Sequence, residues 1–134
     1  MGTTPIAALR RLRDAGSDGR LDTLCECHGL RVLGAFGSAL NTSDPHDLDI
    51  AALFVSNDFD LIGLYDDLTQ LSGCDVLDIA VLNGAPPTLR ARALCGLGLY
   101  EREAGDYAIA QMAALAEYRD TAPLRRLELE RLAG

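Results

Sequence analysis

A small turn followed by three acidic residues on two later hydrophobic segments constrains this chain more than any other feature. Gly37-Ser38 follows one apolar run, Asp47-Leu48-Asp49 begins a second, and Asp75 begins a third. Residues i and i+2 of a β-strand point to the same face, so Asp47 and Asp49 are expected to present both carboxylates on one side of a sheet. Neighbouring carboxylates repel each other at neutral pH and favour a divalent cation between them. The pattern predicts a sheet that carries a cation site.

Apolar periodicity and turn residues predict alternating helices and strands along the whole chain. Helices are expected at 5–13, 21–27, 59–71, 88–97, 106–119 and 123–132. Strands are expected at 30–36, 47–55 and 75–82, with a short one at 99–101, while 16–19 and 41–46 have turn and loop composition. This order predicts an α/β domain with a small mixed sheet flanked by helices. Residues 1–134 are interpreted as one domain, with C-terminal helices over about 106–132.

Composition excludes several classes of function. The net charge is −8, and clustered cations are needed to grip nucleic acid phosphates, so no direct nucleic-acid binding is expected. All twelve basic residues are arginine, so any phosphate must be held by backbone amides, hydroxyls, metal or arginine. No apolar run approaches the roughly 20 residues of a membrane span, and the N-terminal segment lacks the apolar core of a signal peptide. A cytoplasmic location is the expectation.

The turn and the acids together have the parts needed to hold a nucleoside triphosphate. Gly37 lets the backbone approach a phosphate without a Cβ in the way, and Ser38 offers a hydroxyl and an amide. Asp47 and Asp49 could bridge two metal ions, as in two-metal phosphoryl transfer. Asp75 could bind one of these ions or take a proton from an attacking hydroxyl. Mg²⁺ or Mn²⁺ is the expected cofactor, with a nucleoside triphosphate as the substrate.

These residues resemble the signature of the minimal nucleotidyltransferases (MNT family) of the DNA polymerase β-like superfamily. That signature is Gly-Ser, a spacer, Asp-x-Asp, and a third Asp in a later hydrophobic strand, and it falls here on Gly37, Ser38, Asp47, Asp49 and Asp75. Segments 75–79, 85–87, 89–90 and 99–101 look like the subgroup encoded beside HEPN-domain proteins. The resemblance covers roughly residues 20–103 and implies a polymerase β-like nucleotidyltransferase core.

Two features of the match leave alternatives open. Asp75 and Asp78 lie three residues apart, so on a strand they face opposite sides, and periodicity does not choose between them. The family match selects Asp75 as the third carboxylate, with Asp78 as the fallback. The spacer 39–46 is shorter than the family's, and Ala39-Leu40-Asn41 replaces an Arg/Gly pattern common there. If arginine normally helps to hold the phosphates, this chain must use another group.

Other polar residues near these motifs have both an ordinary structural interpretation and a functional one. Loop residues at the edge of the site could contact phosphate, two tyrosines could pack or stack on a base, and two arginines after Pro87 could be solvated or meet phosphates or a partner. These residues are Asp44, His46, Tyr100, Tyr107, Arg90 and Arg92.

The resemblance implies transfer of AMP from ATP as the substrate, or of another nucleoside monophosphate from its triphosphate, to a hydroxyl acceptor. It further implies that the acceptor is a tyrosine of a HEPN-type toxin and that this chain is the antitoxin. The alternative is a non-catalytic module of the same fold that neutralises a partner by contact alone. An antibiotic-modifying enzyme of the superfamily is less favoured, because the chain has little room for a second, drug-binding domain.

Overall fold

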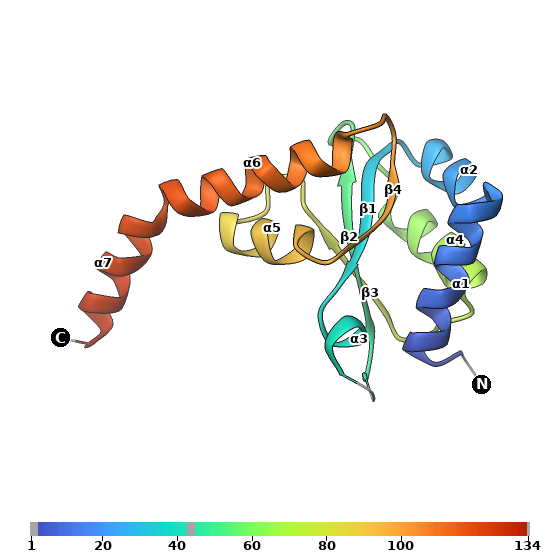
Figure 1. Cartoon of the computed structure of the whole chain (residues 1–134), viewed down its shortest axis with the longest axis horizontal. Helices are drawn as coiled ribbons and strands as arrows, with labels where there is room; N and C mark the ends of the chain where they lie inside the picture. Colours follow the sequence, from blue (N-terminus) through green and yellow to red (C-terminus); the bar gives the residue numbers. More distant parts are fainter. Residues whose placement is uncertain (1–2, 43–44, 134) are drawn as a thin grey trace.

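Four strands form one mixed sheet in the order β3-β2-β1-β4 in the computed structural model, which describes residues 3–42 and 45–133 (Figure 1). The central strands β1 (Leu30–Phe36) and β2 (Leu48–Phe54) run antiparallel. β4 (Leu97–Glu101) pairs antiparallel with β1, and β3 (Leu77–Val81) pairs parallel with β2. The parallel pair matters for the site, because β2 and β3 begin at the same edge of the sheet.

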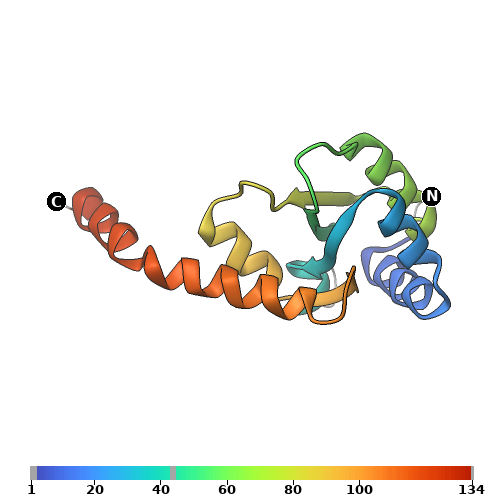
Figure 2. The same ribbon diagram turned by 90° about the horizontal axis from the view of Figure 1, so that it is seen from above.

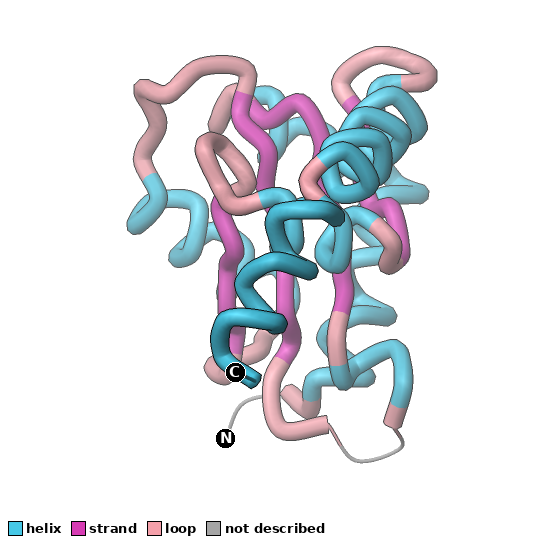
Figure 3. Tube along the Cα trace, turned by 90° about the vertical axis from the view of Figure 1, so that its left-hand side faces the viewer, coloured by secondary structure: helices cyan, strands magenta, loops and turns pink. Residues whose placement is uncertain are grey.

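Helices cover both faces of the sheet, as the views in Figures 1 and 3 show. One face packs against α1 (Pro5–Asp18), α2 (Arg20–Cys27) and α4 (Leu61–Ser72), and the other against α5 (Pro87–Leu94) and α6 (Asp106–Asp120). The described residues also form the short α3 (Ser38–Asn41) and the terminal α7 (Ala122–Ala133). The predicted class, a small mixed sheet flanked by helices, is confirmed.

Strand β2 shows how the sequence sorts its side chains between the two layers. Leu48, Ile50 and Ala52 are buried in the core shared with α1, α2 and α4. Ala51 is buried in the second core, beneath α5 and α6. Both faces are therefore covered, which explains the nearly continuous apolar run in this strand. The alternation also places Asp49 on the α5–α6 face.

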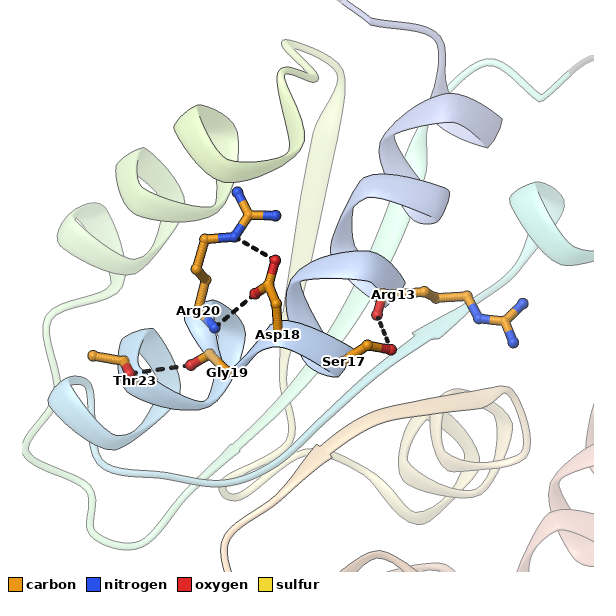
Figure 4. A network of polar contacts seen from close by, with 6 residues as sticks. All are labelled: Arg13, Ser17, Asp18, Gly19, Arg20 and Thr23. Carbon is orange, nitrogen blue, oxygen red and sulfur yellow. Dashed lines mark hydrogen bonds and ion pairs between the residues drawn. The ribbon is translucent and has the colours of Figure 1, made fainter.

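The connection between α1 and α2 differs from the predicted turn at 16–19. The first helix continues through Gly16 to Asp18, and Gly19 ends it with a φ of 89°, in the left-handed region that favours glycine. The Asp18 carboxylate then accepts hydrogen bonds from the Arg20 backbone N–H (3.0 Å) and Nε (2.8 Å), as Figure 4 shows. The backbone hydrogen bond is the main reason that the pKa of Asp18 is lowered.

Several contacts attach α5 firmly to α6. The Leu94 carbonyl at the end of α5 accepts hydrogen bonds from the Tyr107 hydroxyl (3.2 Å) and the Gln111 amide (3.0 Å). Arg90 donates to the Glu117 carboxylate at 3.0 Å. The Tyr107 ring lies against the glycines of β1 and β4, where a Cβ on Gly34 would come within 2.8 Å of its hydroxyl. The end of α5 is thereby held at a fixed place over the sheet.

The C-terminal helices extend beyond the sheet. In Figures 1 and 2, α6 runs past the strands and α7 projects away from the rest of the molecule. No residue of α7 is buried, and its leucines are exposed, Leu132 by 84% and Leu129 by 67%. Within the described part of the chain, none of the helices has the length and apolar character to cross a membrane.

Candidate active site

Three carboxylates meet at the edge of the sheet where β2 and β3 begin. Asp47 immediately precedes β2, Asp49 is its second residue, and Asp78 is the second residue of β3. Asp49 and Asp78 are register partners across the parallel pair. One oxygen from each of the three carboxylates lies within 4.8 Å of the other two. The sheet register therefore creates a compact acidic group from residues separated by about thirty positions.

The alternation of strand residues explains why Asp78 belongs to this group. In β3, Leu77, Ile79 and Val81 contact the core formed with α1, α2 and α4. Ala80 contacts the opposite core, beneath α5 and α6. Because alternate residues point to opposite faces, Asp78 shares the face of Ala80, which is also the face of its partner Asp49.

Asp75 does not lie where the sequence analysis expected it. The strand was predicted to begin at Asp75, but β3 begins at Leu77, and Asp75 is an exposed residue in the preceding bend. The group of three carboxylates formed by the described residues contains Asp78 and not Asp75. The structure thus brings the fallback residue, rather than the one selected by the family match, to Asp47 and Asp49.

The electrostatics of the group favour a bound cation. Partial burial is the main cause that raises the pKa of Asp49, and the neighbouring carboxylates of Asp47 and Asp78 raise it further. The Arg92 guanidinium acts in the opposite direction. Carboxylate oxygens are the donors that Mg²⁺ and Mn²⁺ prefer, so the donor set fits the predicted metal.

Removing one charge from this group should stabilise the protein when no divalent ion is present. The raised pKa means that folding disfavours ionised Asp49. This penalty is absent below the ordinary value of 3.8, where the carboxyl is protonated in both the folded and unfolded states, and is complete above the raised pKa. Near neutral pH and with chelator, Asp49→Asn should therefore melt at a higher temperature than the wild type. Asp75→Asn, the matched control outside the group, should melt like the wild type; an Asp49→Asn protein that melts lower would contradict the prediction.

The turn after β1 lies directly beside the acidic group. Gly37 has φ 80° and ψ −148°, a conformation that residues with a side chain rarely adopt. A Cβ at this position would also collide with the Asp49 carboxylate. A small turn was expected at Gly37-Ser38 and a loop from 41 to 46, but residues 38–41 form the short helix α3, and the Asn41 side chain donates to the Gly37 carbonyl at 3.0 Å. Position 37 therefore requires glycine for two reasons: the positive φ and the lack of space for a Cβ beside Asp49.

A hollow of about 520 Å³ adjoins the turn and the acidic group. This volume is within the range of small-molecule sites, roughly 300–1,000 Å³. The hollow is bounded by the end of β1, α3, the start of β2 and the end of α5; its lining includes Gly37, Ser38, Asn41, Asp49, Arg92 and Gly96. Two predicted nucleotide-binding residues, Gly37 and Ser38, thus share one hollow with the predicted metal ligand Asp49.

The remaining candidates separate into structural residues and one that lines the hollow. Tyr100 is buried in the core, and Tyr107 packs on the β1–β4 glycines, so both take the packing interpretation. Arg90 is paired with Glu117, whereas Arg92 reaches the hollow. His46 is exposed in the loop before β2, and Asp44 lies outside the described residues.

Comparison with known proteins gives matches only among solved structures. No family model and no curated protein matches the sequence. A chain of a toxin–antitoxin complex with AMP-PNP is 18% identical, with 87% of this chain and 98% of that chain covered and a TM-score of 0.68. A chain of the MntA–HepT toxin–antitoxin complex is 19% identical, with 87% and 97% covered and a TM-score of 0.63.

A third similar structure comes from Shewanella oneidensis. It is described as a tri-AMPylated HEPN toxin in complex with an MNT antitoxin, and one of its chains is 17% identical over 91% of this chain and 99% of that chain, with a TM-score of 0.66. At such identities the likeness shows a shared fold. The nucleotidyltransferase-like fold that the sequence motifs predicted is confirmed over nearly the whole length of the matched chains.

Proposed function

We propose that this chain is a metal-dependent nucleotidyltransferase of the MNT type, which transfers AMP from ATP to a hydroxyl of a HEPN-type toxin and so acts as its antitoxin. One observation carries the proposal: the carboxylates of Asp47, Asp49 and Asp78 converge beside a hollow that Gly37 and Ser38 also line. The shared fold supports it, because the similar structures include a complex with AMP-PNP and a tri-AMPylated toxin.

The arrangement of residues suits in-line transfer at the α-phosphorus. The acceptor oxygen forms a bond to the α-phosphorus while the bond from that phosphorus to the oxygen bridging to the β-phosphate breaks, and pyrophosphate leaves. Asp78 is exposed, so it is the carboxylate of the three that an incoming hydroxyl reaches most easily and can give up its proton to. Gly37 and Ser38, which line the hollow beside Asp49, hold the phosphates.

Asp47, Asp49 and Asp78 are the residues that would hold Mg²⁺ or Mn²⁺. When bound, the metal neutralises phosphate charge and lowers the pKa of the attacking hydroxyl. Asp49 is partly buried and is the register partner of Asp78, so its position is set by the sheet rather than by a loop. This placement keeps the carboxylates close together despite their repulsion.

The C-terminal helices support a protein as the acceptor. Helix α6 exposes Ile109 and Met112 by 67% and 68%, and α7 exposes four leucines by 59% or more. Six large apolar side chains exposed on two consecutive helices exceed the single scattered ones that are normal on a surface, and gathered exposed apolar side chains mark protein interfaces. We propose this α6–α7 surface as the part that contacts the HEPN-type partner.

The same surface also favours the alternative, in which the chain neutralises its partner by contact without catalysis. The two functions differ in what happens to the partner. In the first, the partner gains AMP and a chain without the acidic group gives no protection; in the second, the partner keeps its mass and the acidic group is dispensable.

Co-expression with a HEPN-type toxin encoded beside this chain tests the proposal. Wild-type chain should restore growth, and intact-mass measurement should show the toxin heavier by one or more AMP units. The double variant Asp47→Asn plus Asp49→Asn should still co-purify with the toxin but leave its mass unchanged and growth inhibited. Restored growth with an unmodified toxin would instead establish inhibition by contact.

A further inference from the structure

The hollow beside the acidic group has opposite charges on its two sides. Asp49 lines it from β2, and Arg92 lines it from α5. Among the described residues that line it, Arg92 is the cationic one. A ligand that combines a divalent cation with several anionic oxygens matches this distribution, because the cation meets the carboxylates and the anion meets the guanidinium.

The backbone that carries Arg92 is fixed in place. Its neighbours Ala91 and Ala93 are buried, as is Leu94, whose carbonyl accepts the two hydrogen bonds from α6. The next turn lies tightly against β1, since a Cβ on Gly96 would come within 2.9 Å of the Phe36 Cβ. The position of Arg92 relative to the end of β1 therefore follows from packed elements.

The guanidinium of Arg92 is directed over the site rather than into a structural ion pair. Its Cζ lies 5.7 Å from the centre of the Phe36 ring, a cation–π distance. Phe36 is the register partner of Asp49 in the sheet. Within the described part of the chain Arg92 forms no ion pair, whereas Arg90, on the same helix, is paired with Glu117. Arg92 thus retains its hydrogen-bond donors for a ligand.

We propose that Arg92 binds the triphosphate of the nucleotide in this hollow, an inference that rests on the proposed function. The chain has no lysine, so a phosphate-binding cation has to be an arginine. Guanidinium presents paired donors that match phosphate oxygens and stays charged at every working pH. Arg92 then contacts the phosphates from α5 while the turn at Gly37 contacts them from β1.

Binding measurements on purified protein with Mg²⁺ test this role. Arg92→Gln should weaken ATP binding by about 10- to 100-fold, the range for losing a charge-assisted hydrogen bond. Inorganic tripolyphosphate should lose affinity by a similar factor, because the contact is to phosphate and not to base or ribose. Arg92→Lys, which keeps the charge but not the paired donors, should fall between the wild type and Arg92→Gln.

Arg126→Gln is the matched control, since Arg126 is exposed on α7, the helix that projects away from the sheet in Figure 1. It makes the same charge change and should leave both affinities as in the wild type. The inference is overturned if Arg92→Gln binds ATP and tripolyphosphate normally, or loses only ATP, or raises only the KM for the acceptor. If the wild type still binds ATP and transfers AMP in those cases, the proposed function stands and only the role of Arg92 is wrong. If the wild type binds neither ATP nor tripolyphosphate, both the role of Arg92 and the proposed function are wrong.

Discussion

Asp78→Asn should reduce AMP transfer by roughly 10²- to 10³-fold, the cost of removing one charged group from a preorganised transition-state site. Asp75→Asn should leave the rate unchanged. The two variants make the same nearly isosteric change on residues three positions apart. Only Asp78 lies within 4.8 Å of the carboxylates of Asp47 and Asp49, so only its loss weakens the metal site and removes the nearest acceptor of the hydroxyl proton.

Transfer is measured as AMP gained by the toxin under single-turnover conditions, with far-UV circular dichroism to establish that both variants fold. Asp78 is exposed, so its replacement should not disturb the core. Asp78→Asn should also keep its association with the partner, because the apolar α6–α7 surface lies elsewhere. Activity lost in Asp75→Asn and retained in Asp78→Asn would restore Asp75 as the third carboxylate.

The choice between Asp75 and Asp78 as the third carboxylate is one that sequence reasoning could not decide. Periodicity showed that Asp75 and Asp78 cannot share a face, but it could not show which of them lies on the same face of the sheet as Asp49. That choice depends on where the strand begins and on the parallel register that pairs Asp49 with Asp78. A parallel pairing is a long-range property, set by the crossover through α4, and local sequence carries little information about it.

Local signals were sufficient for most of the elements. The strand 30–36 was predicted with the observed bounds, and the first helix begins at Pro5 as predicted, with the Thr4 side chain accepting a hydrogen bond from the Ala7 N–H. The helix α3 was missed because four residues with no periodic pattern give no signal of their own. Gly16 was taken as part of a turn, although it lies inside α1.

The importance of Arg92 was beyond sequence reasoning for a different reason. Arg90 and Arg92 occupy the same helix two positions apart, and both were compatible with a solvated face. The structure separates them because α6 packs beside α5 and provides Glu117 for one arginine only. The contact between α5 and α6 decides which side of α5 faces the hollow. The α6 sequence does not reveal this contact, because α6 is apolar on both its buried and its exposed sides.

Gly37→Ala should abolish most nucleotide binding and transfer, with a loss of roughly 100-fold or more, whereas Ser38→Ala should cost only about fivefold, the equivalent of one hydrogen bond of about 1 kcal/mol. The alanine must adopt a positive φ, and its Cβ must occupy the place of the Asp49 carboxylate. The variant therefore displaces a metal ligand as well as the phosphate-binding turn. Gly84→Ala separates these effects, because Gly84 has a similar φ of 73° and open space around it. It should share the backbone strain and lower the melting temperature, yet bind ATP as the wild type does. Normal ATP affinity in a folded Gly37→Ala protein would show that this turn and Asp49 do not act together on the nucleotide.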